Sequence, residues 1–157
     1  MRYERTAVLH GELWRLVTGH LIHLGWAHWA LNAFALTLVS LLARAPLSLR
    51  ALSRSIPALA AAISLMLLVF DPEVADYVGL SGVLYGLVLL VLWPQAREGR
   101  WLAWAALLYL AVRVGWQLLS GVPAMEAALI GGPVIEQVHG YGLLVAAVWL
   151  LAGARRG

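Results

Sequence analysis

Five apolar runs, each close to 20 residues long, constrain this 157-residue chain more than any other feature of its sequence. A helix needs about 20 apolar residues to cross the hydrocarbon core of a bilayer, so these runs predict membrane-spanning helices. We expect an all-α fold, a polytopic membrane helical bundle that forms one domain over residues 1–157, with residues 1–20 as an outer loop. The predicted spans cover residues 21–43, 52–70, 77–93, 101–119 and 134–153.

Composition excludes several classes of protein. Apolar residues make up 62% of the chain and charged residues 12%, which is far from the soluble globular range and makes the lipid bilayer a partner. The net charge of +3 does not predict a nucleic-acid partner, because the arginines lie between the apolar runs and form no single basic face. The absence of cysteine excludes disulfides, thiolate nucleophiles and cysteine-based metal sites.

The charges between the runs predict orientation. Basic residues are retained on the cytoplasmic side of membrane proteins, so the breaks after the first, third and fifth runs should face the cytoplasm. The other breaks are acidic, which places the N-terminus outside and the C-terminus inside. The basic residues are Arg44, Arg50, Arg54, Arg97, Arg100, Arg155 and Arg156; the acidic ones are Asp71, Glu73, Asp76, Glu126 and Glu136.

Polar side chains within the apolar runs are costly in lipid, so each is expected to be paired or functional. Three of them, His28, Ser81 and His139, lie near the starts of the first, third and fifth runs, which cross the bilayer in the same direction. We therefore expect these three side chains at one depth, near the outer face. The complete set is His23, His28, Asn32, Ser81, Arg113, Gln117 and His139.

Ser81 lies in Gly79-Leu80-Ser81-Gly82, where the glycines permit an abrupt entry from loop to helix and a close backbone approach. A helix start there presents free N–H groups to a developing oxyanion. Packing of Gly82 against Gly142 would bring the serine within hydrogen-bond reach of His139. These features favour Ser81 as a nucleophile and His139 as its base.

Plainer interpretations stand beside this one. A serine in a membrane helix most often bonds to its own backbone, and a lone histidine most often links two helices. Arg113, with Gln117 on the same helix face, either snorkels outward or pairs with Glu126 or Glu136. The histidines near the N-terminus are expected in the outer loop or at the interface, where His20 and His23 with Glu136 and Gln137 would form a polar collar for water access. The N-terminal histidines are His10, His20 and His23.

Taken together, these residues resemble the rhomboid family of intramembrane serine proteases. The resemblance rests on Trp14-Arg15, on His28 and Asn32 in a His-x-x-x-Asn pattern, on the stretch from Gly79 to Tyr85, and on His139-Gly140-Tyr141-Gly142. It implies a rhomboid-like bundle with a serine/histidine dyad that needs no cofactor and no metal. The implied roles are Ser81 as nucleophile, His139 as general base, His28 and Asn32 as oxyanion donors, Tyr85 stacked on His139, and Gly79, Gly82 and Gly142 as supporting residues.

The stretch from Gly11 to His28 is similar in particular to the compact bacterial branch called rhombosortases. That likeness implies single-span membrane protein substrates with a C-terminal Gly-Gly, a hydrophobic helix and a basic tail. It also implies the bacterial inner membrane, with the active site open to the periplasmic or extracellular side.

The family core has six helices, so we expect a further apolar helix upstream of Met1, which would also explain how Arg2, Arg5 and Arg15 reach the outer side. In the last span, Ala146 occupies the position of a second family glycine. The alternatives are a catalytically silent helix-binding relative, a haem protein that uses His23 or His28 with His139, and a transporter. A silent relative would be expected to lack Ser81 or His139, and both are present. A haem protein does not need the Gly-x-Ser-Gly motif. The sequence contains no matched pair of interrupted helices that would support a transporter.

Overall fold

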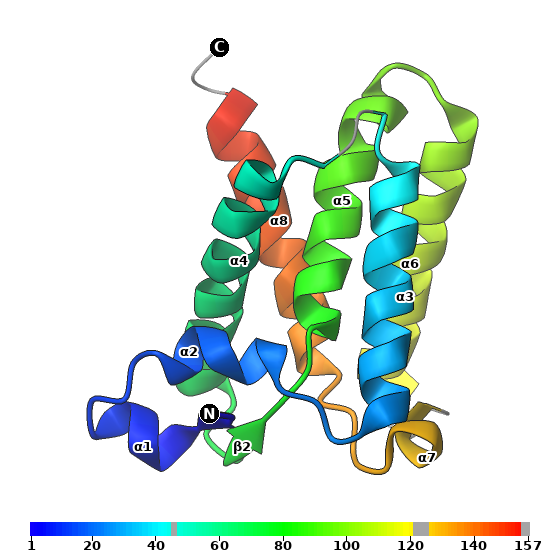
Figure 1. Cartoon of the computed structure of the whole chain (residues 1–157). Helices are drawn as coiled ribbons and strands as arrows, with labels where there is room; N and C mark the ends of the chain where they lie inside the picture. The colour runs from blue at the N-terminus through cyan, green and yellow to red at the C-terminus, as the bar shows by residue number, and fades with distance from the viewer. Residues whose placement is uncertain (45–46, 121–125, 155–157) are drawn as a thin grey trace.

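The computed structural model describes residues 1–44, 47–120 and 126–154. Five long helices dominate these ranges and stand side by side (Figure 1). The all-α bundle predicted from the apolar runs is therefore confirmed. The helices are α3 (Trp26–Leu42), α4 (Leu49–Phe70), α5 (Ser81–Arg97), α6 (Trp101–Ser120) and α8 (Gln137–Ala154).

The helix boundaries differ from the ends of the apolar runs. The third run begins at Tyr77, yet the helix begins only at Ser81, because the preceding residues form a short strand and a turn in which Gly79 has φ +123°. The start of α4 also differs, at Leu49 and not at residue 52, because the Ser48 hydroxyl accepts a hydrogen bond from the Ala51 N–H and caps the helix. Hydropathy counts apolar loop residues as helix and misses caps.

Three of the helices, α4, α6 and α8, are long and apolar enough to cross a bilayer on their own. Helices α3 and α5 have 17 residues each, about 25 Å of helix, at the lower limit for a span. The segment Arg15–Leu21 would extend α3, but it meets that helix at 96° and so runs across its end. We therefore treat the segment before α3 as lying outside the spans.

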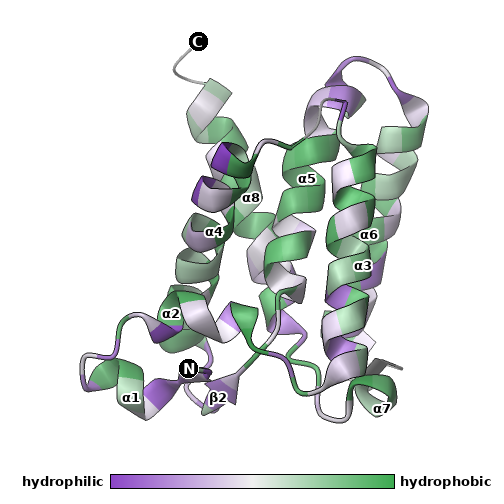
Figure 2. Ribbon diagram, in the orientation of Figure 1, coloured by the Kyte–Doolittle hydropathy of each residue, from purple (hydrophilic) through white to green (hydrophobic). Residues whose placement is uncertain are grey.

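The outward faces of the bundle suit lipid. Hydrophobic residues cover most of each long helix, and the hydrophilic residues gather mainly toward the ends (Figure 2). Large apolar side chains such as Phe34, Leu108 and Leu151 are each more than 60% exposed. An exposed apolar surface of this extent is favourable only when lipid covers it. The chain is a multi-pass membrane protein.

Helices α3, α5 and α8 begin at the same end of the bundle, where α4 and α6 end (Figure 1). The N-terminal segment and the short helix α7 (Glu126–Ile130) lie at this end too. At the opposite end, Arg44 after α3 and Glu98 after α5 form an ion pair between two connections. Arg155 and Arg156, which the sequence assigns to that side, fall outside the described residues.

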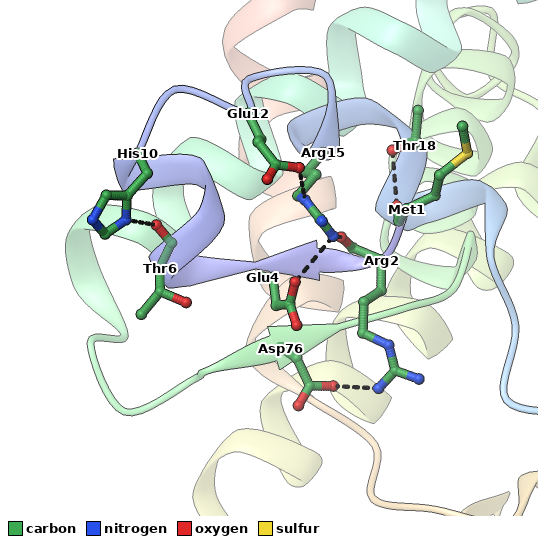
Figure 3. A network of polar contacts seen from close by, with 9 residues as sticks. All are labelled: Met1, Arg2, Glu4, Thr6, His10, Glu12, Arg15, Thr18 and Asp76. Carbon is green, nitrogen blue, oxygen red and sulfur yellow. Dashed lines mark hydrogen bonds and ion pairs between the residues drawn. The ribbon is translucent and has the colours of Figure 1, made fainter.

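The N-terminal segment is folded, although the sequence predicted a loop there. It contains β1 (Tyr3–Glu4), α1 (Arg5–Leu9), α2 (Arg15–Thr18) and the 3₁₀ helix η1 (Gly19–Leu21). Strand β1 pairs antiparallel with β2 (Asp76–Tyr77), just before α5. Figure 3 shows the ion pairs that tie this segment together: Arg2 with Asp76, and Arg15 with both Glu4 and Glu12.

Arg5 fastens the same segment to the bundle. Its guanidinium donates to the carbonyl oxygen of Leu68 at 2.9 Å and to those of Leu67 and Asp71 at 3.5 Å. The last carbonyls of a helix have no partner within it, so the Arg5 guanidinium supplies them with donors and its charge also favours the negative end of the α4 dipole.

A second contact holds the N-terminal segment in place. Tyr3 is fully buried beside Gly19, where a Cβ would come within 2.5 Å of the Tyr3 nitrogen.

Helix α5 lies at the centre of the bundle, in contact with α3, α4, α6 and α8. It is apolar around most of its circumference, as a helix enclosed by others requires. Its contact with α8 is the most extensive in the fold. This arrangement fixes the start of α5 against the start of α8. The buried residues of α5 are Gly82, Val83, Leu84, Gly86, Leu87, Leu92, Gln95 and Ala96.

Candidate active site

Ser81 and His139 meet where α5 and α8 begin. Ser81 is the first residue of α5 and His139 is the third residue of α8. The Nε2 atom of His139 lies 3.1 Å from the Oγ atom of Ser81, which is hydrogen-bond distance. His139 is buried and Ser81 is half-buried. The two residues that the sequence paired are therefore in contact, although they lie 58 residues apart in the chain.

Three glycines let the two helices approach closely enough for this contact. A Cβ at Gly82 would lie 2.8 Å from the carbonyl oxygen of Val138, and one at Gly142 would overlap the carbonyl oxygen of Gly82. Gly86 lies in the same line of close contact between α5 and α8, which we call the seam, since a Cβ added to Gly86 would lie 2.9 Å from the carbonyl oxygen of Gly142. Sequence reasoning overlooked Gly86, although its four-residue spacing from Gly82 is a known helix-packing signal. Ala146 continues the seam and is fully buried.

The imidazole ring of His139 is stacked on a tyrosine. The rings of Tyr85 and His139 lie 4.3 Å apart at an interplanar angle of 11°, which is the contact that the family resemblance implies. Tyr85 is four residues after Ser81, one helical turn further along α5. A flat contact over the ring restricts its rotation and holds Nε2 toward the serine.

Arg113 of α6 contacts the tyrosine of this stack. Its Nε donates a hydrogen bond to the Tyr85 hydroxyl at 3.1 Å. The sequence suggested that Arg113 snorkels outward or pairs with Glu126 or Glu136, and it did not anticipate the tyrosine. The side chain of Glu126 falls outside the described residues. Pairing with Tyr85 depends on how α5 and α6 are rotated toward each other, which a linear pattern does not encode.

His28 and Asn32 lie one turn apart on α3 and are both buried. The Nδ1 atom of His28 faces the Leu24 N–H at 3.4 Å and acts as an acceptor, so a neutral ring carries its proton on Nε2. That Nε2 lies beside Gly79, where an added Cβ would be only 2.7 Å away. The Asn32 amide nitrogen donates to the His28 carbonyl oxygen at 3.1 Å. Both side chains therefore offer N–H donors next to Ser81.

Gly79 is held in its unusual conformation by its neighbours. The Tyr77 hydroxyl donates to the Gly79 carbonyl oxygen at 2.6 Å, and the Gly79 N–H donates to Gly19 in the N-terminal segment. A positive φ of +123° is strained for any residue with a side chain. These bonds connect the folded N-terminal segment to the loop that carries Ser81.

Two adjoining cavities meet at Ser81. The larger, about 230 Å³, lies between α3, α5 and α6 and reaches Tyr85, Arg113 and Gln117. The smaller, about 100 Å³, extends toward Asp76 and Tyr77 at the N-terminal end of the bundle. Four residues line both cavities, so the two form one path past the serine. The shared residues are His28, Ser81, Ile130 and Val134.

A second serine and histidine pair provides a useful comparison. His20 Nε2 lies 3.0 Å from Ser64 Oγ, and both residues are fully buried. The Ser64 hydroxyl donates a hydrogen bond to the Leu16 carbonyl oxygen at 2.8 Å. The ring of His20 is therefore the donor in its hydrogen bond with Ser64, and it does not act as a base toward this serine. Neither residue lines the two cavities at Ser81. This pair joins the N-terminal segment to α4.

The position of His20 corrects an expectation from sequence. His20 was placed in a polar collar around a path for water, with His23, Glu136 and Gln137, but its side chain is 0% exposed. Burial lowers the pKa of His20 to about 4, which keeps the ring neutral. No three His, Asp or Glu side chains come together as a metal site would require within residues 1–44, 47–120 and 126–154.

The rhomboid domain model matches residues 10–155, nearly the whole chain. The match includes all the helices that carry the residues around Ser81. No curated protein and no solved structure matches the chain.

Proposed function

The chain belongs to the rhomboid family, whose members are generally intramembrane serine proteases, and we propose that it is itself an intramembrane serine endopeptidase. Ser81 is the nucleophile and His139 the general base. The observation that carries this proposal is the 3.1 Å contact between His139 Nε2 and Ser81 Oγ at the junction of two cavities. A nucleophile within hydrogen-bond reach of a base, with the base oriented by a further group, is the arrangement that acyl transfer requires.

The reaction follows from this geometry. His139 takes the hydroxyl proton as Ser81 Oγ attacks the substrate carbonyl carbon, and the carbonyl oxygen becomes an oxyanion. His139 then gives the proton to the leaving amine, and water hydrolyses the acyl-enzyme with the same histidine as base. In a triad the third member orients the histidine. Here the stacked ring of Tyr85 supplies that orientation.

Oxyanion stabilisation is assigned to His28 and Asn32. The Nε2–H of His28 and the side-chain amide of Asn32 are donors that α3 contributes to the cavity that Ser81 and His139 also line. The N–H groups of Gly82 and Val83 at the start of α5 precede the first intrahelical bond, from Leu84 N to Leu80 O. Donors fixed in a site shielded from water need little reorganisation when charge develops, which is why such sites accelerate acyl transfer.

The substrate is proposed to be a single-span membrane protein. The cavities open within a bundle whose outer surface suits lipid, so a chain that reaches Ser81 arrives from the membrane or its edge. The likeness of residues 11–28 to rhombosortases supports a finer proposal, in which the substrate carries Gly-Gly before a hydrophobic helix and a basic tail. Glycines weaken a helix by about 1 kcal/mol each and so favour the extended backbone that the serine attacks.

The proposed location is the bacterial inner membrane, with the site open to the outer side. The connections at the Ser81 end carry Asp71, Asp76 and Glu136, whereas Arg44 and Arg100 lie in the connections at the opposite end. The arginines of the N-terminal segment, at the Ser81 end, are balanced by acidic partners, since Arg2 pairs with Asp76 and Arg15 with Glu4 and Glu12. Arginine-rich ends remain in the cytoplasm. This distribution supports an outward-facing active site.

Cleavage of a membrane-anchored Gly-Gly substrate in proteoliposomes tests the proposal. We expect Ser81→Ala and His139→Ala each to abolish cleavage, because the two residues act as a unit. Ser64→Ala is the matched control, since it removes the hydroxyl of the other serine and histidine pair and should leave cleavage measurable. Full activity in Ser81→Ala would end the protease assignment.

A further inference from the structure

The α6 wall of the larger cavity carries a buried glutamine. Gln117 is 8% exposed, and its Oε1 atom is buried without a hydrogen bond from any described residue. A buried acceptor that lacks a donor costs free energy, so an unpartnered amide oxygen on a residue that lines a cavity points to a missing donor. Gln117 has no role in the chemistry assigned to Ser81 and His139.

The surroundings of Gln117 indicate what that donor is. The cavity also contains Ser81 and His139, so whatever occupies it lies next to the reacting atoms. Its remaining wall is largely apolar, with Leu31, Leu84 and Ile130 among the lining residues. Helix α6 contributes two polar residues to the lining, Arg113 and Gln117, and polar groups fix the orientation of an occupant.

A substrate that is attacked by Ser81 must be unwound from its helix. Unwinding frees main-chain N–H groups that the substrate helix had satisfied, and a group that enters the bundle then needs an acceptor there. Main-chain N–H groups are present whatever the substrate sequence, whereas a side-chain donor is not. The occupant that best matches the unpartnered oxygen of Gln117, in a cavity that Ser81 also lines, is thus an extended main chain.

We propose that Gln117 Oε1 accepts a hydrogen bond from one main-chain N–H of the substrate, beside the scissile bond. This inference rests on the proposed protease function and adds a substrate-binding residue to it. Arg113, one turn before Gln117 on the same wall, contacts Tyr85 and closes the cavity on that side. Gln117 thereby aligns the extended substrate with the stacked rings of Tyr85 and His139.

An amide-to-ester scan of a transmembrane peptide substrate tests this. Each main-chain N–H near the cleavage site, apart from that of the scissile bond, is replaced in turn by an ester oxygen, and kcat/KM is measured in micelles. We expect one position to lose roughly five- to tenfold with the wild-type enzyme, as loss of one hydrogen bond does. The same ester should cost nothing further in Gln117→Leu. Gln117→Glu, which keeps an acceptor, should retain the position-specific loss.

Gln95 supplies the matched control. It is also a buried glutamine, but its amide is satisfied by Leu42, Val91 and Arg100 at the opposite end of the bundle. Gln95→Leu should lower stability and still show the loss at the same substrate position. Equal ester penalties in wild type and Gln117→Leu, or no penalty at any position in wild type, would overturn the inference. Cleavage that persists in Ser81→Ala would instead overturn the protease proposal, so the two failures are distinguishable.

Discussion

The Cα of Gly142 faces the carbonyl oxygen of Gly82 so closely that a Cβ at position 142 would overlap that oxygen. The contact couples the start of α8 to the start of α5, and it lies one turn from the hydrogen bond between His139 and Ser81. The distance between Ser81 and His139 therefore depends on how closely α5 and α8 pack.

Gly142→Ala should separate α5 from α8 and lengthen the distance between His139 and Ser81. We expect cleavage to fall by at least about 100-fold, because misplacement by about 1 Å is enough to cause such losses. Gly153→Ala is the control on the same helix, since a Cβ there meets nothing within 4 Å. Normal cleavage by Gly142→Ala, measured with the same substrate, would show that the close approach is dispensable.

Tyr85 contributes a ring and a hydroxyl that two substitutions separate. Tyr85→Phe keeps the stack on His139 and loses the hydrogen bond from Arg113, so we expect a decrease in kcat of a few fold. Tyr85→Ala loses both and should decrease kcat much more, because the imidazole is then free to rotate. Steady-state kinetics of the two variants measures the difference. Equal effects would assign the role of Tyr85 to its hydroxyl.

His28→Ala or Asn32→Ala should lower kcat by roughly 10² to 10³, with a much smaller change in KM, as the loss of one oxyanion donor does. The contact between Ser81 and His139 does not involve either residue, so it should survive. The check is a full kinetic analysis of each variant beside the wild type. An effect confined to KM would assign these residues to packing of α3.

His20 should make the fold sensitive to acid. Its pKa is about 4 when folded and near 6.5 when unfolded, so below pH 6.5 the unfolded chain binds a proton that the folded chain does not. Stability should therefore fall as the pH decreases from 6.5 to 4, by up to roughly 3 kcal/mol. His20→Gln removes this titration and should flatten the dependence, as measured by unfolding in micelles. Parallel curves for the two proteins would refute the assignment.

The sequence predicted the residues around Ser81 because lipid makes polar side chains conspicuous. Ser81, His28 and His139 stand out in apolar runs, and the common direction of three spans places them at one end. The contact of Arg113 with Tyr85 and the pair of His20 with Ser64 were not predictable, because partner choice depends on helix rotation and on the fold of the N-terminal segment.

Helix ends were predicted less well than helices. Residues 77–80 are apolar enough to extend a span, yet they form the end of β2 and the turn at Gly79 that leads to Ser81. The strand pairing of Tyr3 with Tyr77 joins distant segments, and two-residue strands leave no periodicity to detect. The short helix α7 was missed for the same reason, since five residues give too few turns to show a pattern.

Labelling with a fluorophosphonate probe, followed by mass spectrometry of the modified peptide, tests the central claim most directly. A serine activated by a neighbouring base reacts with such a probe, whereas an ordinary hydroxyl does not. We expect modification of Ser81 in the wild type and in Ser64→Ala, and none in Ser81→Ala. Modification that persists in Ser81→Ala, or that is found at Ser64, would contradict the account.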